Sequence, residues 1–269
     1  MKVSIVVPTK NEEKNIENCL KLAAKQNFPR ENFEIVVVDN DSSDQTKEIA
    51  AKYADKVFDH GPERSAQRNF GIRKAGGMYV MYIDADMRLS EDVVRECVEK
   101  AEGNSELVAL FIPEKISGKS YWNKVRNFER DFYNATAIDA PRFVRKEKFF
   151  EAGGFDENLT GPEDWDLAKK IRRLGKTDII KSFLLHNEEE FTLKKYLAKK
   201  TYYSRDFEKY VMKWGKNDPD IRKQFGLWYR YVGVFTENGK WKKLLCHPIL
   251  AAGMYIERFL VGLNYVFRK

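Results

Sequence analysis

The stretch Tyr79-Val80-Met81-Tyr82-Ile83-Asp84-Ala85-Asp86 has the composition of a buried β-strand that ends in two carboxylates. Short apolar runs bounded by polar residues are typical of strands that lie inside a parallel sheet. Side chains two positions apart on a strand share a face, so we expect the carboxylates of Asp84 and Asp86 to lie close together.

Four further apolar runs accompany this stretch along the chain. They are Val3–Val7, Phe33–Val38, Val57–Phe58 and Leu107–Ile112. Helical patterns separate the runs, and strands that alternate with helices predict an α/β fold with a mainly parallel, doubly wound sheet flanked by helices. Ligands of such sheets bind beyond the carboxyl ends of the strands, so the residues that follow each run are candidate site residues.

Several residues indicate where the helices begin. Thr9 and Glu12 have the spacing of a capping box, which predicts a helix start at that point. Further helices are expected from about Gln45, over Ser65–Ala75 and over Ser90–Ala101, the last with Glu91 and Asp92 in its first turn.

Composition bounds the class of protein. The chain has 269 residues, of which 43% are hydrophobic, so it can bury a sizeable core and is neither disordered, nor collagen-like, nor a disulfide scaffold. Lys and Arg number 48 against 41 Asp and Glu, and the net charge of +7 suits nucleic acid, phosphorylated metabolites or anionic lipid headgroups. Three widely spaced cysteines without a CxxC motif favour a reducing compartment and argue against structural zinc.

The residue pattern of the chain changes after residue 112 and again after residue 191. We expect a first subdomain over residues 1–112, a second and smaller one over residues 113–191, and a basic helical extension over residues 192–269. The opening run Val3–Val7 is too short for a secretion signal or a membrane span.

The two carboxylates of Asp84 and Asp86 predict a site for a hard divalent cation. Close carboxylates repel each other unless a cation or a proton lies between them, and Mg²⁺ or Mn²⁺ prefers oxygen ligands. The alternative is that these acidic residues merely end the strand in solvent. His186 follows the apolar run Ile179–Leu185 and would suit Mn²⁺, although a single His at a strand end is more often structural.

The second strand also ends in polar residues, Asp39-Asn40-Asp41-Ser42-Ser43-Asp44. Carboxylates at this place can accept hydrogen bonds from a nucleotide base or ribose, but Asp and Ser are also ordinary turn and cap residues. The segment Arg64–Ile72 is basic, and its guanidinium groups suit phosphate or a solvated surface equally. After the first strand stands Pro8-Thr9-Lys10-Asn11-Glu12 rather than GxGxxG, which argues against a dehydrogenase.

The segment Glu163-Asp164-Trp165-Asp166 follows Gly161-Pro162 at the start of a predicted helix. Acidic residues stabilise a helix start in any case. A carboxylate at the open edge of the sheet would also serve as the base that an attacking hydroxyl needs.

Together these segments resemble the inverting family 2 glycosyltransferases with the GT-A fold. The resemblance rests on five motifs in the family's order over about residues 3–175: Val6–Glu12, Val38–Ser42, Arg64–Ile72, Asp84-Ala85-Asp86, and Gly153-Gly154-Phe155-Asp156 with Glu163-Asp164-Trp165-Asp166. It implies a Rossmann-like, mainly parallel sheet with a nucleotide-sugar-binding subdomain at residues 1–112, an acceptor-binding subdomain at residues 113–191 and the C-terminal extension.

The resemblance also implies roles for single residues. Those that would bind the nucleotide sugar are Pro8, Thr9, Glu12, Asp39, Asp41, Arg68 and Asp84. Mn²⁺ or Mg²⁺ would be held by Asp86 with Asp84, and His186 matches a His that completes the metal site in some GT-A enzymes. Asp164 would be the catalytic base and Glu163 would orient the acceptor. The implied reaction moves a sugar from a UDP or GDP sugar to a hydroxyl or lipid-phosphate-linked acceptor, in one displacement that inverts the anomeric carbon.

The tail carries separate information. Pro248–Phe267 is largely apolar, but Glu257 and Arg258 lie in its middle, and such charges disfavour a spanning helix. Flanking Lys and Arg residues leave two interpretations open, a helix in the plane of the headgroups or a helix packed on the catalytic domain. We expect a cytoplasmic protein, either free or peripheral on the cytoplasmic face of the cell membrane. The basic segment Leu193–Lys213 is expected to be one helix, either an acceptor-side lid or a solvated face.

Two other functions remain as alternatives. A sugar-nucleotide pyrophosphorylase would carry a glycine- and arginine-rich loop after its first strand, where this chain has Pro8–Glu12. A non-enzymatic nucleic-acid-binding protein would account for the net charge, but its phosphates would be repelled by the acidic strand ends. We therefore expect no nucleic-acid partner.

Overall fold

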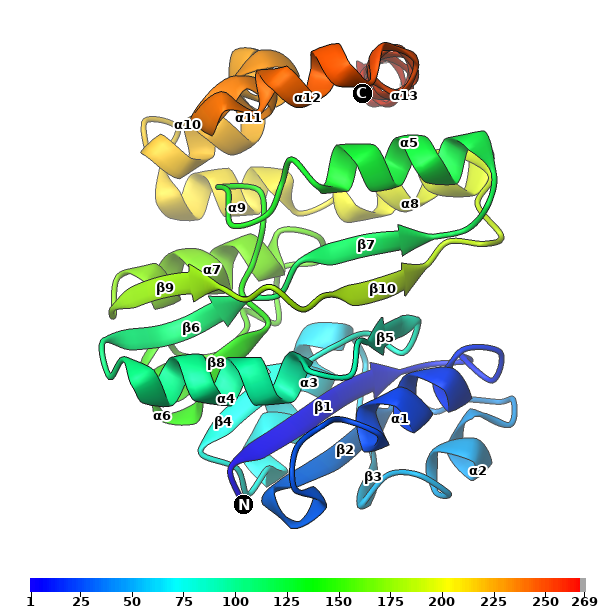
Figure 1. The fold of residues 1–269 in the computed structure, drawn as a ribbon, viewed down its shortest axis with the longest axis vertical. Helices are drawn as coiled ribbons and strands as arrows, with labels where there is room; N and C mark the ends of the chain where they lie inside the picture. Colours follow the sequence, from blue (N-terminus) through cyan, green and yellow to red (C-terminus); the bar gives the residue numbers. More distant parts are fainter. Residues whose placement is uncertain (267–269) are drawn as a thin grey trace.

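A seven-stranded sheet forms the centre of the computed structural model, which describes residues 1–266 (Figure 1). In spatial order the strands are β3 (Lys56–Asp59), β2 (Phe33–Asp39), β1 (Val3–Thr9), β4 (Tyr79–Tyr82), β8 (Phe143–Arg145), β6 (Leu107–Phe111) and β9 (Lys176–Ile179). Strands β1 to β4 are parallel and β6 is parallel to β9, whereas β8 is antiparallel to both β4 and β6. The predicted α/β fold with a mainly parallel sheet is confirmed.

Alternation along the strands places helices on both faces of this sheet. Val3, Ile5 and Val7 of β1 share one core with α1 (Ile16–Ala24) and α4 (Val93–Gly103), and the short α2 (Thr46–Ala50) joins the same side. Val6 faces the other way, into a core shared with α3 (Arg64–Lys74), α6 (Lys146–Glu151) and α7 (Glu163–Arg172). Because both faces are covered, β1, β2 and β4 are mostly apolar, although Ser4 and Glu34 are buried within β1 and β2, where the hydroxyl of Ser4 donates to Glu34.

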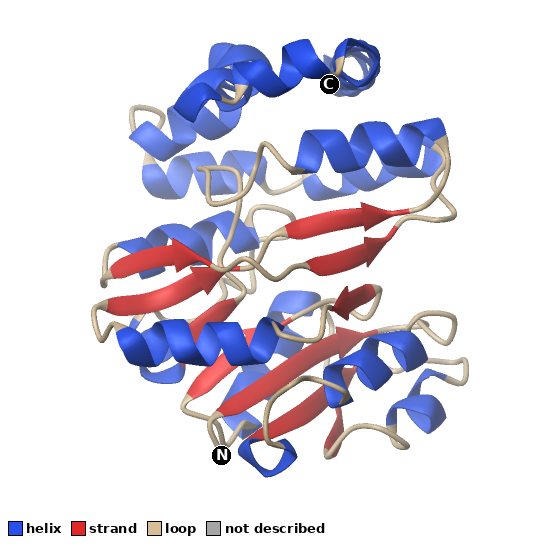
Figure 2. Ribbon diagram, in the orientation of Figure 1, coloured by secondary structure: helices blue, strands red, loops and turns tan. Residues whose placement is uncertain are grey.

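A second sheet of three strands lies beside the carboxyl ends of the first. Its order is β5 (Met87–Leu89), β10 (Leu184–Asn187) and β7 (Glu114–Ser117), and Figure 2 shows it in red between β1 and the helices above. The register pairs His186 with Met87, and the backbone N–H of Asn187 donates to the carbonyl of Asp86 at 2.9 Å. This sheet therefore carries His186 to the end of β4.

Helices from the second half of the chain form a layer at one end of the molecule (Figure 1). They are α5 (Tyr121–Arg130), α8 (Leu193–Tyr203), α9 (Phe207–Trp214), α10 (Pro219–Phe225), η2 (Tyr229–Gly233), α11 (Val234–Thr236), η3 (Glu237–Gly239), α12 (Trp241–Cys246) and α13 (Pro248–Val266); the short η1 (Arg30–Asn32) lies before β2. A third core joins Val125 and Phe128 of α5 to Phe235 and Met254 of the tail. Within residues 1–266, no helix has the length and hydropathy that crossing a membrane requires.

The predicted helix starts need correction at two places. Thr9 is the last residue of β1, and α1 begins only at Ile16 after a turn in which Asn11 has a φ of 52°, so Thr9 and Glu12 form no capping box. Likewise α4 begins at Val93, and Asp92 is its N-cap residue rather than part of its first turn. In both cases residues that suit a helix start precede the actual start, Glu12 in the turn before α1 and Glu91 before α4.

Two further expectations about the second half were wrong. His186 does not end one run that begins at Ile179, because β9 and β10 are separate strands in different sheets. The segment Leu193–Lys213 forms two helices, α8 and α9. The end of the tail at Phe267 lies outside the described residues. The division at residues 112 and 191 stays a prediction, and β8 and β9 from the second segment complete the sheet of the first.

Candidate active site at the ends of the central strands

A cavity of about 570 Å³ opens at the carboxyl ends of β1 and β4. The loops after β1 and β4, the start of α3, strand β10 and helix α8 provide its walls. The residues that line it are Pro8, Thr9, Lys10, Glu12, Glu63, Arg64, Gln67, Asp84, Ala85, Asp86, His186, Ala198, Lys199, Tyr202 and Tyr203. A volume of this size is typical of small-molecule sites, and the position is where ligands of open α/β sheets bind.

Asp86 and His186 face each other in this cavity. Oδ2 of Asp86 lies 3.0 Å from Nε2 of His186, and Nδ1 of the same ring lies 3.0 Å from Oε1 of Glu114. Burial acts to lower the pKa of His186, but the two carboxylates outweigh it and raise the pKa to about 10. Burial acts to raise the pKa of Asp86, yet His186 holds it below its usual value. In the described structure the pair is therefore an ion pair.

The donor set of this corner fits a divalent cation. Oδ1 of Asp86 is buried without a hydrogen-bond partner, which is unusual for a carboxylate oxygen. Glu114 faces the remote nitrogen of His186, the arrangement by which a carboxylate orients a metal-binding His. Among residues 1–266, no three His, Cys, Asp or Glu side chains are grouped to hold an ion on their own. Phosphate oxygens and water would have to complete the coordination, as is usual for Mg²⁺.

Two arginines of α3 connect the cavity to the start of α7. Arg68 is fully buried; Nη2 donates to Oδ1 of Asp84 at 2.5 Å, and Nη1 donates to Oδ1 of Asp164 at 3.0 Å. Its guanidinium also lies over the rings of Tyr82 and Phe155, at 5.4 and 5.2 Å from their centroids. In the structure Arg68 spans two carboxylates, and its expected contact with the nucleotide stays a prediction.

Arg64, one turn earlier on α3, is the arginine that lines the cavity. Nη2 of Arg64 donates to Oε1 of Glu163 at 3.0 Å, and Nη1 lies 3.9 Å from Oδ2 of Asp84. Burial acts to raise the pKa of Asp84, but the charges of Arg68 and Arg64 hold it well below its usual range. Asp84 is therefore an ionised carboxylate tied to two cations.

Glu163 and Asp164 differ in their surroundings although they are adjacent in α7. Glu163 is 2% exposed, its Oε2 has no partner, and burial together with the charge of Asp164 raises its pKa. Asp164 keeps 26% of its side chain exposed and binds Arg68 through Oδ1. One guanidinium group thus bridges Asp164 to Asp84, so the two predicted motifs lie within a few ångströms of each other.

The remaining predicted residues divide into two groups. Pro8, Thr9 and Glu12 line the cavity, and burial with the nearby charges of Asp86 and Asp84 raises the pKa of Glu12. Asp39 is fully buried and accepts hydrogen bonds from the backbone N–H and the hydroxyl of Ser42 at 2.7 and 2.5 Å. Asp41 is exposed. Neither Asp39 nor Asp41 is among the residues that line the cavity, and their nucleotide contacts stay predictions.

Sequence reasoning missed the contribution of α8 to the cavity. Lys199, Tyr202 and Tyr203 line it from the side opposite β1, and the ring of Tyr203 lies 5.0 Å from the guanidinium of Arg64. Burial acts to lower the pKa of Lys199, but electrostatic interactions with Tyr203, Asp86 and Asp84 outweigh it, so that the pKa is raised. Only the lid interpretation of the basic tail segment pointed to these residues.

Residues 4–156, more than half of the chain, match the family described as glycosyl transferase family 2, and the chain belongs to this family. The fold and the order of the motifs agree with that assignment.

Curated relatives carry transferase names. The poly(ribitol-phosphate) beta-N-acetylglucosaminyltransferase TarS of Staphylococcus aureus is 33% identical over 128 residues, which are 44% of this chain and 22% of TarS. The poly(ribitol-phosphate) beta-glucosyltransferase of Bacillus spizizenii is 26% identical over 227 residues, 79% of this chain and 32% of that protein. The chain thus spans less than a third of the length of either relative.

Solved structures share the fold. The mannosyltransferase PcManGT of Pyrobaculum calidifontis, in complex with GDP-Man and Mn²⁺, has a TM-score of 0.66 at 20% identity, covering 98% of this chain and 84% of that one. Residues 1–349 of S. aureus TarS, in complex with UDP-GlcNAc, have a TM-score of 0.58 at 22% identity over 77% of this chain and 66% of that one. These likenesses confirm the GT-A fold class.

Proposed function

We propose that the protein is a metal-dependent, inverting glycosyltransferase that moves a sugar from a UDP or GDP sugar to a hydroxyl or lipid-phosphate-linked acceptor. The observation that carries the proposal is the cavity at the strand ends, which is lined by Asp84, Asp86 and His186. Behind this lining, the guanidinium of Arg68 links Asp84 to Asp164, which does not itself line the cavity. Family membership favours this activity over a pyrophosphorylase or a nucleic-acid-binding protein.

The donor would lie across the ends of β1 and β4. Pro8, Thr9 and Glu12 line the part of the cavity nearest β1 and would contact the base and ribose. Arg64 and Lys199 line the cavity beside the Tyr203 ring, at 5.0 and 5.9 Å from its centroid, and both would bind the diphosphate; Lys10 is a further cation in the lining. The GDP-Man and UDP-GlcNAc held by the two solved relatives are of the donor class that we propose.

A divalent cation held by Asp86 and His186 would offset the charge that builds up on the departing diphosphate. Ion pairing with Arg68 and Arg64 keeps Asp84 ionised and fixed next to that corner. Glu114 holds the ring of His186 in place from its far side. The chain thus orients both sides of the diphosphate site before the donor arrives.

Asp164 is the proposed base. Arg68 occupies its Oδ1, which leaves Oδ2 to take the proton of an acceptor hydroxyl while that oxygen attacks the anomeric carbon opposite the diphosphate. The new C–O bond forms as the bond to the diphosphate breaks, so a single displacement inverts the configuration. Glu163 is buried beside Arg64 and would act on the acceptor indirectly, by fixing the start of α7.

The acceptor class decides whether this base is needed. A hydroxyl must lose a proton, whereas a lipid phosphate is already ionised. Relatives with different acceptors in their names occur, such as the dolichol-phosphate mannosyltransferase of Pyrococcus furiosus and the poly(ribitol-phosphate) beta-glucosyltransferase of B. spizizenii. The cysteines Cys19, Cys97 and Cys246 are free, which supports a cytoplasmic location.

The test compares Asp164→Asn with Asp59→Asn, a change at an exposed carboxylate far along the sheet edge. Release of UDP or GDP from a panel of nucleotide sugars is measured with hydroxyl and polyprenyl-phosphate acceptors, and donor binding is measured by calorimetry. With a hydroxyl acceptor, Asp164→Asn is expected to lose about a hundredfold or more in turnover while donor affinity stays within about threefold. Wild-type turnover of Asp164→Asn with a hydroxyl acceptor would refute the base assignment.

A further inference from the structure

Helix α13 is amphipathic in an unusual way, because its charged residues point inward. Glu257 accepts a hydrogen bond from Arg126 of α5 at 3.1 Å, and Nη1 of Arg258 donates to Oε1 of Glu129 at 2.5 Å. Glu257 and Arg258 are 1% and 7% exposed. The two charges in the middle of this apolar helix are therefore paired with charges on α5, although Oε2 of Glu257 and Nε of Arg258 have no partner, and they fix which side of α13 faces the protein.

The opposite side of α12 and α13 is apolar and exposed. Its large side chains are Trp241, Leu245, Ile249, Ile256 and Phe259, with exposed fractions of 46, 71, 73, 55 and 60%. The last three recur at helical spacing along α13. With Tyr255, six of the fourteen large exposed hydrophobic side chains of the described residues lie within this short part of the chain. Such clustering on one face marks an interaction surface rather than scattered exposure.

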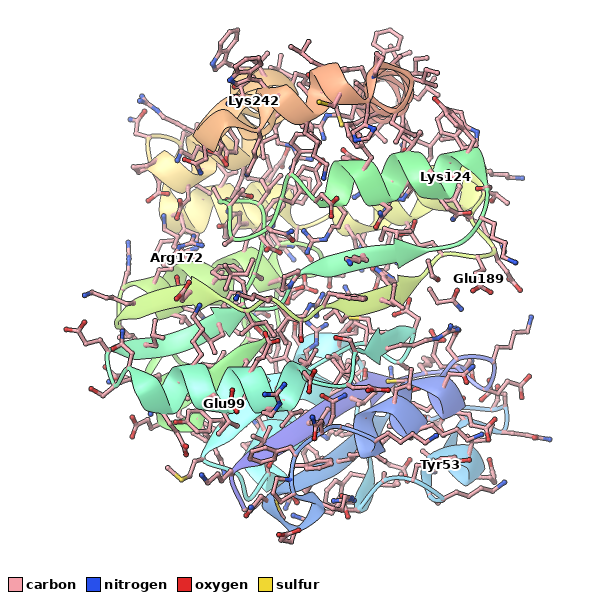
Figure 3. All side chains as sticks on the ribbon, in the orientation of Figure 1. Tyr53, Glu99, Lys124, Arg172, Glu189 and Lys242 are labelled. Carbon is pink, nitrogen blue, oxygen red and sulfur yellow. The ribbon has the colours of Figure 1, made fainter. Side chains whose placement is uncertain are left out.

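The exposed charge beside this surface is positive. Lys242 lies on α12 at the outer edge of the molecule in Figure 3, and it is exposed. The carboxylates of the same region are engaged elsewhere, Glu237 with Lys240 and Glu257 with Arg126. Between Gly239 and Asn264, the described chain exposes no Asp or Glu side chain. An occupant of this surface would meet aromatic and aliphatic groups bordered by a cation.

These features match the boundary between headgroups and acyl chains of an anionic bilayer. Trp and Tyr prefer that boundary, Lys pairs with lipid phosphates, and amphipathic helices of this kind lie in the membrane plane. We propose that the surface formed by Trp241, Leu245, Ile249, Ile256 and Phe259 docks on an anionic lipid bilayer with α12 and α13 parallel to it. This docking resolves the two interpretations of the tail, since one side of the same helix packs on α5 and the other meets lipid.

Helix α13 also contacts α8, the helix that lines the candidate active site. The side chain of Asn264 on α13 donates to the hydroxyl of Thr201 on α8 at 3.0 Å, and α8 lines the cavity at the strand ends. If the glycosyl transfer proposed above is correct, the docked bilayer and the donor cavity are connected through α13 and α8. The docking itself does not depend on that activity.

Flotation of the full chain with vesicles tests the proposal. Vesicles of phosphatidylcholine alone are compared with vesicles of phosphatidylcholine and phosphatidylglycerol in equal amounts. The wild type is expected to float with the anionic vesicles, and the double variant Ile249→Glu/Ile256→Glu is expected to lose about tenfold or more in partitioning. The matched control is Met78→Glu, which changes a 62% exposed side chain beside β4 and is expected to float like the wild type. Lys242→Glu is expected to weaken binding to the anionic vesicles alone.

Three results would overturn the proposal: no flotation of the wild type with anionic vesicles, equal flotation of the double variant, or a wild-type dimer in solution that the double variant reduces to a monomer. The last result would assign the surface to a second copy of the chain. Quenching of Trp241 fluorescence by brominated lipids, measured as the part lost in Trp241→Phe, tests the same contact without any charged substitution. Absence of that quenching component would also refute it.

Discussion

Replacing Arg68 by Met provides a sharp test of how the candidate site is built. The guanidinium is fully buried and donates to Asp84 and Asp164, which keep 19% and 26% of their side chains exposed. Removing one partner of a buried ion pair typically costs 3–5 kcal/mol, because the other charge is left without compensation. Partial exposure of both carboxylates places the expected loss near the lower end, at about 3 kcal/mol.

The loss is measured as the free energy of unfolding in urea at pH 7, with Arg73→Met as the control. Arg73 is exposed on the same helix, and its substitution is expected to change stability by less than about 0.5 kcal/mol. The variant Arg68→Lys keeps the charge but cannot span two carboxylates with a planar fork, so an intermediate loss is expected.

The pH dependence of the loss follows from Asp84, whose folded pKa Arg68 and Arg64 hold well below its usual range. A depressed carboxyl pKa contributes stability above the unfolded value of about 4, and that contribution is lost as the pH falls below it. The difference between the wild type and Arg68→Met should therefore shrink toward acidic pH. If the variant is as stable as the wild type at pH 7, Arg68 does not stabilise the fold by bridging the two carboxylates.

Three further changes test other parts of the account. Gly71→Ala should destabilise the protein by about 1–3 kcal/mol in urea unfolding, because the added Cβ would lie 2.5 Å from the side chain of Val6 in the sheet. In the control Gly103→Ala the added Cβ meets no atom within 4 Å, so this change should be neutral or slightly stabilising. Burial and neighbouring cations lower the pKa of Lys200 to about 8, so stability should rise from pH 8 to pH 10 in the wild type relative to Lys200→Met, as followed by thermal melting. Lys199→Met should weaken UDP binding about tenfold in calorimetric titrations, and an unchanged affinity, equal to that of the exposed control Lys195→Met, would remove Lys199 from the site.

Local patterns were sufficient to predict the first half of the fold. Apolar runs at Val3–Val7 and Phe33–Val38 became β1 and β2 with one or two further residues, because burial on both faces demands continuous apolar side chains. The carboxylates after β4 were predicted to lie at the open edge of the sheet, and Asp84 and Asp86 line the cavity there. The carboxyl ends of parallel strands meet at one edge of the sheet, so the residues that follow each strand in the sequence indicate which side chains lie at that edge.

Contacts between distant segments were beyond such patterns. Asp86 and His186 are 100 residues apart, and only the resemblance to a family brought them together before the structure did. The role of Arg68 depends on Asp164, which is 96 residues away. The basic sequence at the start of α3 does not distinguish a buried arginine from a solvated one. The inward charges of α13 likewise require the partner helix α5, which no periodicity within α13 identifies.

The most direct test of the central claim is calorimetric titration of UDP and GDP sugars into the wild type and Asp86→Asn, each with Mn²⁺ and with a chelator. We predict that one donor binds the wild type with an affinity that falls about tenfold or more when Mn²⁺ is removed, and that Asp86→Asn binds weakly under both conditions. Binding that is equally tight with the chelator, or unchanged in Asp86→Asn, would contradict the assignment of this corner as the cation and diphosphate site.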